Sequence, residues 1–257
     1  MPEVTAAVVA AAEAFGLDPG SVRPLGGTSG SAWGVGGRVL RIGRRAGLDA
    51  EVAAAAAAAA AVPVPRVIDR VEVGQASAVL LEMLPGRPAM ELAAGEPDLA
   101  RAAGRSCGAL HALLAAVPAP GGLREVPGAV GQHGRAGPGR LLHLDLHPLN
   151  VLVDPSGAVT GVVDWANAAA GDPVLDRART WAILTLDPLA RRQREPGWTA
   201  LAEGWAESGQ LSDIPAAARA WACRFMLTDL ARRYQPGELQ HVADALEIAE
   251  AAARDSG

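Results

Sequence analysis

The chain has 257 residues, of which 50% are hydrophobic and 20% charged, and 28 acidic against 23 basic residues give it a net charge of −5. This length allows one large domain or two lobes with a substantial core, and the apolar fraction excludes a disordered chain. The negative charge argues against a nucleic-acid binder, the absence of lysine excludes chemistry that needs a lysine amine, and two cysteines are too few for a disulfide scaffold.

The N-terminal stretch does not resemble a secretory signal, because residues 1–16 contain two acids and no base. The longest apolar run, residues 53–65, is shorter than the roughly 20 residues that span a bilayer. We therefore expect a cytoplasmic protein that binds neither membrane nor nucleic acid.

The first 84 residues predict a small lobe made of a sheet and one helix. An alanine-rich helix over residues 4–15 precedes three short strands at 22–25, 31–35 and 38–42. A second alanine-rich segment, 48–61, predicts the helix of the lobe and ends at a Val-Pro-Val-Pro stretch. Two further strands follow at 66–73 and 77–84.

Beyond Gly86 the pattern becomes helical. A 3.6-residue apolar stripe predicts a helix over 97–117, and residues 118–139 form a loop rich in glycine and proline. Short strands or loops are expected over 141–154 and 159–165, and helices from 172 to 253. We expect an α+β chain with an N-lobe over 1–84, a hinge at 82–86 and a C-lobe over 85–257.

The most informative motif starts at His143 and reads His-Leu-Asp-Leu-His-Pro-Leu-Asn, and a hydrophobic strand ending in Asp164 follows it. The spacing H-x-D-x-x-x-x-N, then Asp, matches the catalytic loop and metal-binding aspartate of protein kinases. Phosphoryl transfer needs a carboxylate at the acceptor hydroxyl, which Asp145 can supply. It also needs oxygen ligands for Mg²⁺, which Asn150 and Asp164 can supply. The alternative, that the aspartates are only turn or cap residues, is disfavoured because three elements agree in type and spacing.

The wider stretch resembles the aminoglycoside phosphotransferase and choline-kinase-like family. The matching segments are HLDLHPLNVLVD from residue 143, VDWANAAAGDPVLDRA from 163, VPVPR from 62, LEMLPGR from 81 and LHA from 110. The resemblance implies a bilobal protein-kinase-like fold, with a small antiparallel-sheet N-lobe carrying one helix and a larger, mainly helical C-lobe. It also implies ATP, or GTP, and Mg²⁺ as cofactors, and a hydroxyl of a small molecule as acceptor.

Two residues of the expected N-lobe are interpreted by comparison with the family. Arg41 stands where the family carries the lysine that grips the α- and β-phosphates, and Glu51 stands where it carries the partner of that lysine. Arginine keeps the charge but is longer and planar. Arg41 can also be read as a solvated strand residue, and Glu51 as an acid favouring a helix N-terminus.

The nucleotide would contact two further segments. Gly27, Ser29 and Ser31 lie in a glycine-rich hairpin before Arg41, where such folds cover the phosphates, although a hairpin of this kind is more often only a turn. In the resembling enzymes the hinge backbone, here from Glu82 to Leu84, meets the adenine.

The resemblance also gives bracing roles. His143 is expected to support the catalytic loop, and so is Asp176, one turn after an expected helix N-cap at Asp172. Leu144 and Leu149 replace two usual glycines, which we interpret as tolerated because protein kinases carry large side chains at both places.

The acceptor is the least readable part of the sequence. Asp187, Glu203, Glu207 and Asp229 are acids that a polycationic aminoglycoside could use, but they form no dense cluster. Trp198 and Trp205 share a helical face, which favours a core role. An antibiotic-type kinase is the first reading, and a metabolic kinase of choline, sugar or amino-alcohol type and a nucleotide-binding pseudokinase stay open. The oligomeric state stays open as well.

Overall fold

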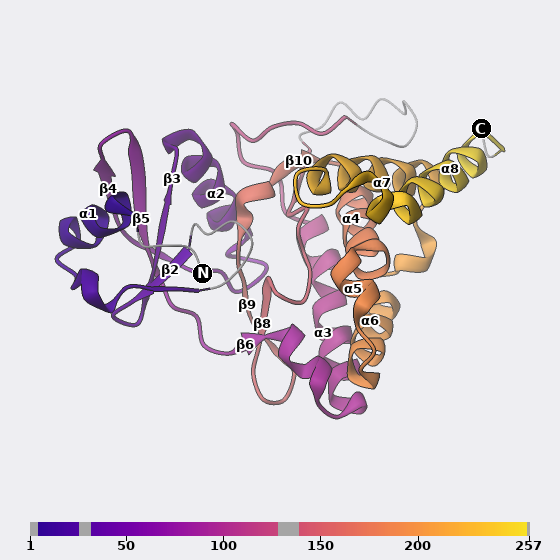
Figure 1. Ribbon diagram of the computed structural model, residues 1–257, viewed down its shortest axis with the longest axis horizontal. Helices are drawn as coiled ribbons and strands as arrows, with labels where there is room; N and C mark the ends of the chain where they lie inside the picture. The colour runs from indigo at the N-terminus through magenta and orange to yellow at the C-terminus, as the bar shows by residue number, and fades with distance from the viewer. Residues whose placement is uncertain (1–4, 26–31, 128–138, 256–257) are drawn as a thin grey trace.

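The computed structural model describes residues 5–25, 32–127 and 139–255 and divides into two lobes (Figure 1). The smaller lobe contains an antiparallel sheet of order β1-β2-β3-β5-β4. Its elements are α1 (Ala6–Ala14), η1 (Pro19–Ser21), β1 (Arg23–Pro24), β2 (Ala32–Val35), β3 (Arg38–Gly43), α2 (Arg45–Ala58), β4 (Val67–Val73) and β5 (Ala76–Glu82). The described part of this lobe thus has α1 as a second α-helix beside α2.

The side chains of β3 alternate between the two faces of this sheet. Leu40 lies opposite Trp33 of β2 and Leu80 of β5, and all three are buried in a cluster that α1 covers. The next residue, Arg41, therefore points to the other face. That face is turned toward α2 and the larger lobe (Figure 1).

Helix α2 begins at Arg45, three residues before the predicted start, and ends at Ala58 rather than at residue 61. The prediction was wrong at the start because the first turn is exposed and polar, so no apolar periodicity marks it. Glu51 consequently lies in the middle of the helix and not in its first turn. Ala54 and Ala58 of α2 are buried in the core of the larger lobe, so α2 links the two lobes.

The larger lobe is mainly helical and contains two small antiparallel sheets, β6-β8-β9 and β10-β7. Its strands are β6 (Arg87–Pro88), β7 (Arg140–Leu142), β8 (Val151–Val153), β9 (Val159–Val162) and β10 (Ala169–Gly171). Its helices are η2 (Ala89–Ala94), α3 (Pro97–Ala115), η3 (Trp165–Asn167), α4 (Pro173–Leu186), α5 (Pro188–Arg192), α6 (Pro196–Ser208), η4 (Leu211–Asp213), α7 (Ala216–Leu230), η5 (Pro236–Leu239) and α8 (Gln240–Asp255). This architecture confirms the predicted α+β fold with a sheet lobe and a helical lobe.

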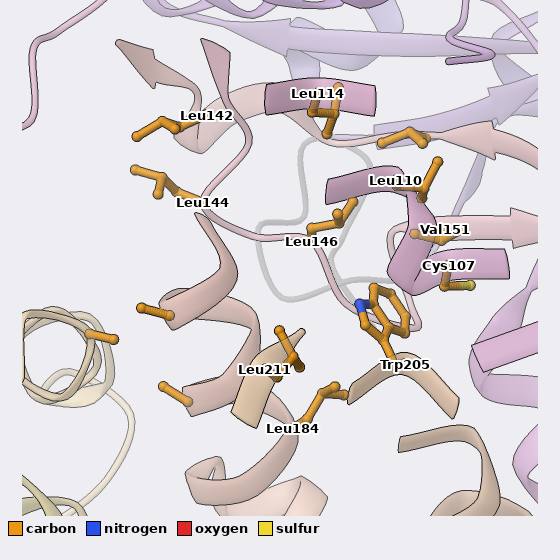
Figure 2. Packing of buried hydrophobic residues seen from close by; sticks show 14 of the residues in the cluster. Cys107, Leu110, Leu114, Leu142, Leu144, Leu146, Val151, Leu184, Trp205 and Leu211 are labelled. Atoms are coloured by element: carbon orange, nitrogen blue, oxygen red, sulfur yellow. The ribbon is translucent and has the colours of Figure 1, made fainter. Parts of the chain in front are cut away.

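The core of the larger lobe anchors the segment that follows β7. Leu142, Leu144 and Leu146 are fully buried and belong to the same hydrophobic cluster as Cys107 of α3 and Trp205 of α6 (Figure 2). The tryptophans of α6 belong to this core, as their spacing predicted. Three leucines in alternate positions thus fix the backbone of the segment that carries Asp145.

No helix in the described part of the chain is long and apolar enough to cross a membrane.

Candidate active site

A cleft of about 980 Å³ lies between the two lobes. Its walls include residues that the sequence singled out from both halves of the chain: Arg41, Glu51, Glu82, Leu84, Asn150 and Asp164. Leu149, one of the leucines that replace glycine, also lines it and is 53% exposed. Gly27, Ser29 and Ser31 lie outside the described residues.

Residues 82–84, where the sequence predicts the hinge, line this cleft. The carboxylate of Glu82 accepts a hydrogen bond from Arg66 Nε at 2.9 Å, so its side chain is already engaged. Gly86 has a φ of +104°, and a Cβ there would lie 2.4 Å from Thr160 Oγ1, so this turn requires glycine. The turn that follows residues 82–84 is therefore held in one backbone conformation.

Arg41 joins two carboxylates across the cleft. Its Nη2 atom lies 2.7 Å from Glu51 Oε1 and 3.1 Å from Asp164 Oδ1, so the expected ion pair with Glu51 is present. Burial would lower the pKa of Arg41, but the charges of Glu51 and Asp164 raise it above its ordinary value. Because Glu51 sits in the middle of α2, its place is explained by this ion pair rather than by the helix N-terminus.

One buried nitrogen of Arg41, the Nε atom, has no hydrogen-bond acceptor among the described residues. A buried unpaired donor is costly unless a ligand satisfies it. An oxyanion such as a nucleotide phosphate fits this position, because guanidinium groups bind phosphate oxygens well.

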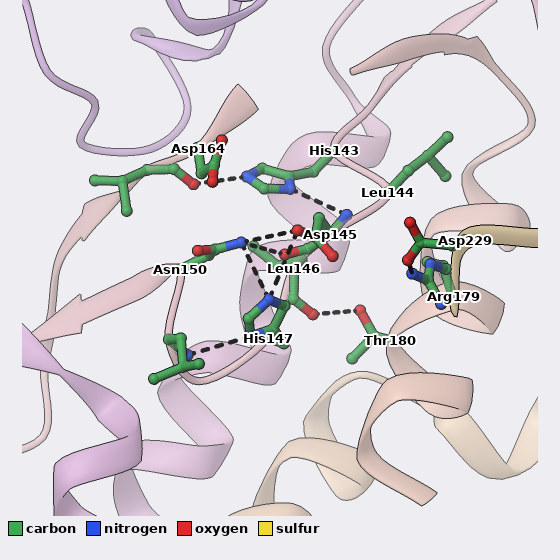
Figure 3. A network of polar contacts seen from close by, with 12 residues as sticks. His143, Leu144, Asp145, Leu146, His147, Asn150, Asp164, Arg179, Thr180 and Asp229 are labelled. Carbon is green, nitrogen blue, oxygen red and sulfur yellow. Dashed lines mark hydrogen bonds and ion pairs between the residues drawn. The ribbon is translucent and has the colours of Figure 1, made fainter. Parts of the chain in front are cut away.

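Asp145 is held by its neighbours in the loop after β7 (Figure 3). Its backbone N–H donates to His143 Nδ1 at 3.2 Å, and its carbonyl accepts from Asn150 Nδ2 at 2.9 Å. Leu149 N–H donates to Nδ1 of His147, and Nε2 of the same ring lies 3.2 Å from Asn150 Nδ2 and 3.7 Å from Asp145 Oδ2. Burial would raise the pKa of the Asp145 carboxyl, but His147 and the charge of Arg179 lower it to about 2.

His143 connects this loop to Asp164. Its Nδ1 accepts from the backbone of Asp145, and its Nε2 lies 3.1 Å from the carbonyl oxygen of Val163, the residue before Asp164. The ring also packs against Trp165, with centroids 4.6 Å apart. His143 therefore connects the backbone beside Asp164 to the backbone of Asp145, and its bracing role stays a prediction.

Helix α4 holds the same loop from the other side. Asp176 Oδ1 accepts a hydrogen bond from the backbone N–H of Leu144 at 2.6 Å, and Thr180 Oγ1 donates to the carbonyl of Leu146 at 2.7 Å. Burial raises the pKa of Asp176 to about 6. The helix starts as predicted, because the Asp172 side chain accepts from Val174 N at its N-terminus.

Leu144 occupies a backbone position that favours glycine. Its φ is +60°, the left-handed region that favours glycine, so the backbone conformation here is the one the usual glycine adopts freely. The side chain is fully buried in the core, and this burial offsets a strain of about 1–2 kcal/mol.

Asn150 and Asp164 offer oxygen ligands of the kind that Mg²⁺ prefers. The Nδ2 atom of Asn150 is tied to Asp145 O and Oδ2, at 2.9 and 3.3 Å, which leaves Oδ1 without a hydrogen bond among the described residues. Asp164 keeps 29% of its side chain exposed and lines the cleft. The donor set of these two residues therefore fits a magnesium ion shared with phosphate oxygens.

Two neighbours of Asp145 had no clear signal in the sequence. The sequence pattern assigns no role to His147, whose partners lie within its own loop, and Arg179 comes from α4, later in the chain. The only hint for Arg179 was its place one turn after Asp176, which puts both on the same helix face.

The acids considered for an acceptor are already engaged. Glu203 and Glu207 pair with Arg101 of α3, and Asp229 pairs with Arg179. Asp187 accepts from Leu189 N at the start of α5.

Comparison with known proteins agrees with this geometry. The model of the phosphotransferase enzyme family APH matches residues 21–128 and 122–221. The chain belongs to this family. Protein YcbJ of Bacillus subtilis is 50% identical over 36 residues, which are 14% of this chain and only 12% of that relative.

The solved structures that match share the fold at low sequence identity. The aminoglycoside phosphotransferase APH(4)-Ia, solved as a thermostable mutant with AMP-PNP and hygromycin B, has a TM-score of 0.65 and 19% identity and covers 97% of this chain and 98% of its own. The aminoglycoside phosphotransferase APH(3'')-Id from Streptomyces rimosus, solved with ADP and streptomycin, has a TM-score of 0.58 and 18% identity. The match covers 81% of this chain and 92% of that one. The macrolide 2'-phosphotransferase MphH from Brachybacterium faecium has a TM-score of 0.52 and 20% identity. The match covers 94% of this chain and 98% of that one. The phosphotransferase thus has the protein-kinase-like fold that its sequence predicted.

Proposed function

We propose that this phosphotransferase transfers the γ-phosphate of ATP, with GTP as the alternative nucleotide, to a hydroxyl of a small molecule in the presence of Mg²⁺. The observation that carries the proposal is the ion pair of 3.1 Å between Arg41 and Asp164. It joins the phosphate-gripping position of the N-lobe to the metal position of the C-lobe in one cleft. In this proposal residues 1–84 bind the nucleotide and residues 85–257 supply the metal ligands, Asp145 and the acceptor pocket.

Asp145 orients the acceptor hydroxyl and receives its proton. A pKa of about 2 keeps the carboxylate ionised at neutral pH, so it accepts a hydrogen bond from the hydroxyl at all working pH values. As the acceptor oxygen forms its bond to the γ-phosphorus, the bond from that phosphorus to the β–γ bridging oxygen breaks. The hydroxyl proton passes to Asp145. His147 and His143 keep the carboxylate in place.

Arg41, braced by Glu51, steadies the α- and β-phosphates, and the hinge backbone from Glu82 to Leu84 faces the base. Asn150 and Asp164 would hold Mg²⁺, which neutralises charge on the phosphates. His143 and Asp176 keep the catalytic loop at its distance from Asp164. Gly27, Ser29 and Ser31 would cover the phosphates.

The acceptor is proposed to be of antibiotic type, since solved relatives include aminoglycoside and macrolide phosphotransferases. Metabolic hydroxyl compounds such as choline, sugars and amino alcohols are the alternative, because they need the same catalytic residues.

The test pairs nucleotide binding with phosphate transfer in Asp145→Asn. This change keeps the size of the side chain and removes the charge that accepts the proton, so nucleotide affinity should stay near wild type. Acceptor-dependent transfer should fall by roughly 100-fold or more. Equal transfer by variant and wild type would refute the role of Asp145. A wild type that binds nucleotide but phosphorylates no compound of a broad acceptor panel would instead be a pseudokinase.

A further inference from the structure

Arg179 is a buried guanidinium next to the catalytic aspartate. Its side chain is only 3% exposed, and its Nη2 atom donates to Asp229 Oδ2 at 2.8 Å. Its Nε and Nη1 atoms are buried and have no hydrogen-bond partner among the described residues. Buried donors without acceptors are rare in proteins, and a ligand that supplies acceptors is one explanation.

A second arginine lies near the first. The Cζ atom of Arg179 is 4.7 Å from the centre of the Phe225 ring, and the Cζ atom of Arg124 is 5.9 Å from the same centre. Arg124 is exposed, and its Nη2 donates to the carbonyl of Asn167 at 3.2 Å. No carboxylate pairs with Arg124 in the part of the chain that the structure describes.

The charge of this cluster is unusual for a site that accepts a polycation. The two guanidinium groups lie against the same aromatic ring. Arg179 forms an ion pair with Asp229, and the carboxylate of Asp229 also lies 3.6 Å from Arg233. The acids of α6 that a polycation could have used pair with Arg101. A ligand with several ammonium groups would therefore meet two guanidinium groups at this cluster, beside the carboxylates of Asp145 and Asp187 that also act on Arg179.

The cluster lies on the acceptor side of Asp145. In Figure 3, Asn150 and Asp164 lie on one side of Asp145, and Arg179 and Asp229 lie on the other. Since the nucleotide cleft is lined by Asn150 and Asp164, an acceptor must approach from the opposite side.

We propose that Arg124, Arg179 and Phe225 form an acceptor subsite that binds an oxyanion, a carboxylate or phosphate group, on the hydroxyl compound that is phosphorylated. The inference rests on the proposed kinase activity, and it replaces the aminoglycoside-like acceptor of that proposal with an acidic hydroxyl compound. Arg124 binds the oxyanion at the surface, the unpaired donors of Arg179 bind it from below, and Phe225 holds both arginines in place. The acceptor is thus an acidic hydroxyl compound and not a polycationic aminocyclitol.

The first experiment uses a library in which each hydroxyl scaffold is present as a carboxylate, a phosphate, a neutral amide and an amine. Nucleotide consumption with Mg²⁺ is measured for every compound, and hygromycin B and streptomycin are included. The carboxylate or phosphate member of the best scaffold should be the preferred acceptor, and the comparison of the two tells which oxyanion is bound.

The second experiment localises the subsite with Arg124→Gln, since Arg124 is exposed and its replacement should not disturb folding. The KM for the oxyanion acceptor should rise about 10-fold or more, the scale of one charge-assisted hydrogen bond, with nucleotide affinity unchanged. The KM for the neutral amide of the same scaffold should rise less, because the amide loses a hydrogen bond but no charge pairing. Arg254→Gln on α8 removes the same charge from an exposed arginine and should behave as wild type.

The remaining outcomes refute the oxyanion, its location or the kinase activity itself. A preference for amines or neutral members refutes the oxyanion and leaves the kinase proposal intact. An oxyanion preference that Arg124→Gln does not alter refutes this location. If no member of the library is phosphorylated, the proposed function fails, and the subsite falls with it.

Discussion

The packing of α3 against α6 gives the sharpest prediction about stability. A Cβ atom at Gly104 of α3 would lie 2.1 Å from the carbonyl oxygen of Leu201 and 2.9 Å from Trp205 N, both in the backbone of α6. Gly204 of α6 is in the reciprocal position, since its Cβ would lie 2.2 Å from Arg101 O. The two backbones are therefore in direct contact, and neither can move aside as a flexible side chain would.

The change Gly104→Ala should destabilise the protein by about 2 kcal/mol or more. Ordinary contact between non-bonded heavy atoms needs about 3.5 Å, so the helices must separate by over about 1 Å. Overpacking of this kind costs about 1–3 kcal/mol or more, and a backbone obstacle places it at the upper end. The better helix propensity of alanine returns about 1 kcal/mol.

Urea unfolding followed by circular dichroism measures this difference, and thermal unfolding should show a melting temperature lower by about 4–8 °C. Gly47→Ala in α2 is the matched control, because a Cβ there has nothing within 4 Å. It should stabilise the protein by up to about 1 kcal/mol. A Gly104→Ala protein as stable as wild type would refute the close packing of α3 and α6.

Three further predictions concern the site. Arg41→Ala should weaken nucleotide binding and lower the free energy of unfolding by about 3 kcal/mol, because it leaves Glu51 buried without its partner. Arg41→Lys should keep part of the nucleotide affinity and part of the stability. Calorimetry measures the affinity, and urea unfolding measures the stability. Leu144→Gly relieves about 1 kcal/mol of strain but removes a fully buried side chain, so it should lower the free energy of unfolding by about 2 kcal/mol or more; equal stability would mean that strain dominates. Asp164→Ala should abolish the increase in nucleotide affinity that Mg²⁺ causes, as measured by titration calorimetry with and without Mg²⁺. If the affinity of the variant still depends on Mg²⁺ as in wild type, Asp164 is not a metal ligand.

The sequence was most informative where spacing and local chemistry decide the structure. The strands of the N-lobe and the N-cap at Asp172 follow from glycine pairs, apolar runs and capping, which act over a few residues. The ion pair between Arg41 and Glu51 followed from the family resemblance, and the structure brings the two side chains together.

What the sequence could not show depends on contacts between distant segments. Leucine rarely adopts a positive φ, so nothing in the sequence could announce the conformation of Leu144, which depends on Asp176 and on the surrounding core. Gly104 reads as a weak point in a helical stripe until the backbone of α6 is placed against it. Arg179 is an ordinary helix residue in the sequence, and only the fold brings it to Asp145 and Phe225.

The replacement of lysine by Arg41 can now be weighed on geometry. A lysine ammonium is a single point of charge, whereas a guanidinium is a planar fork of donors. In this structure one atom, Nη2, contacts both Glu51 and Asp164, so the two ion pairs need no more than the single nitrogen that lysine also has. What arginine adds is Nε, which is buried and has no hydrogen-bond partner among the described residues. The same contact places Arg41 on an oxygen of Asp164 that a metal ion would also need. Nucleotide phosphates that attract Arg41 would thereby release Asp164, so phosphate binding and metal binding at this cleft should be coupled through one side chain.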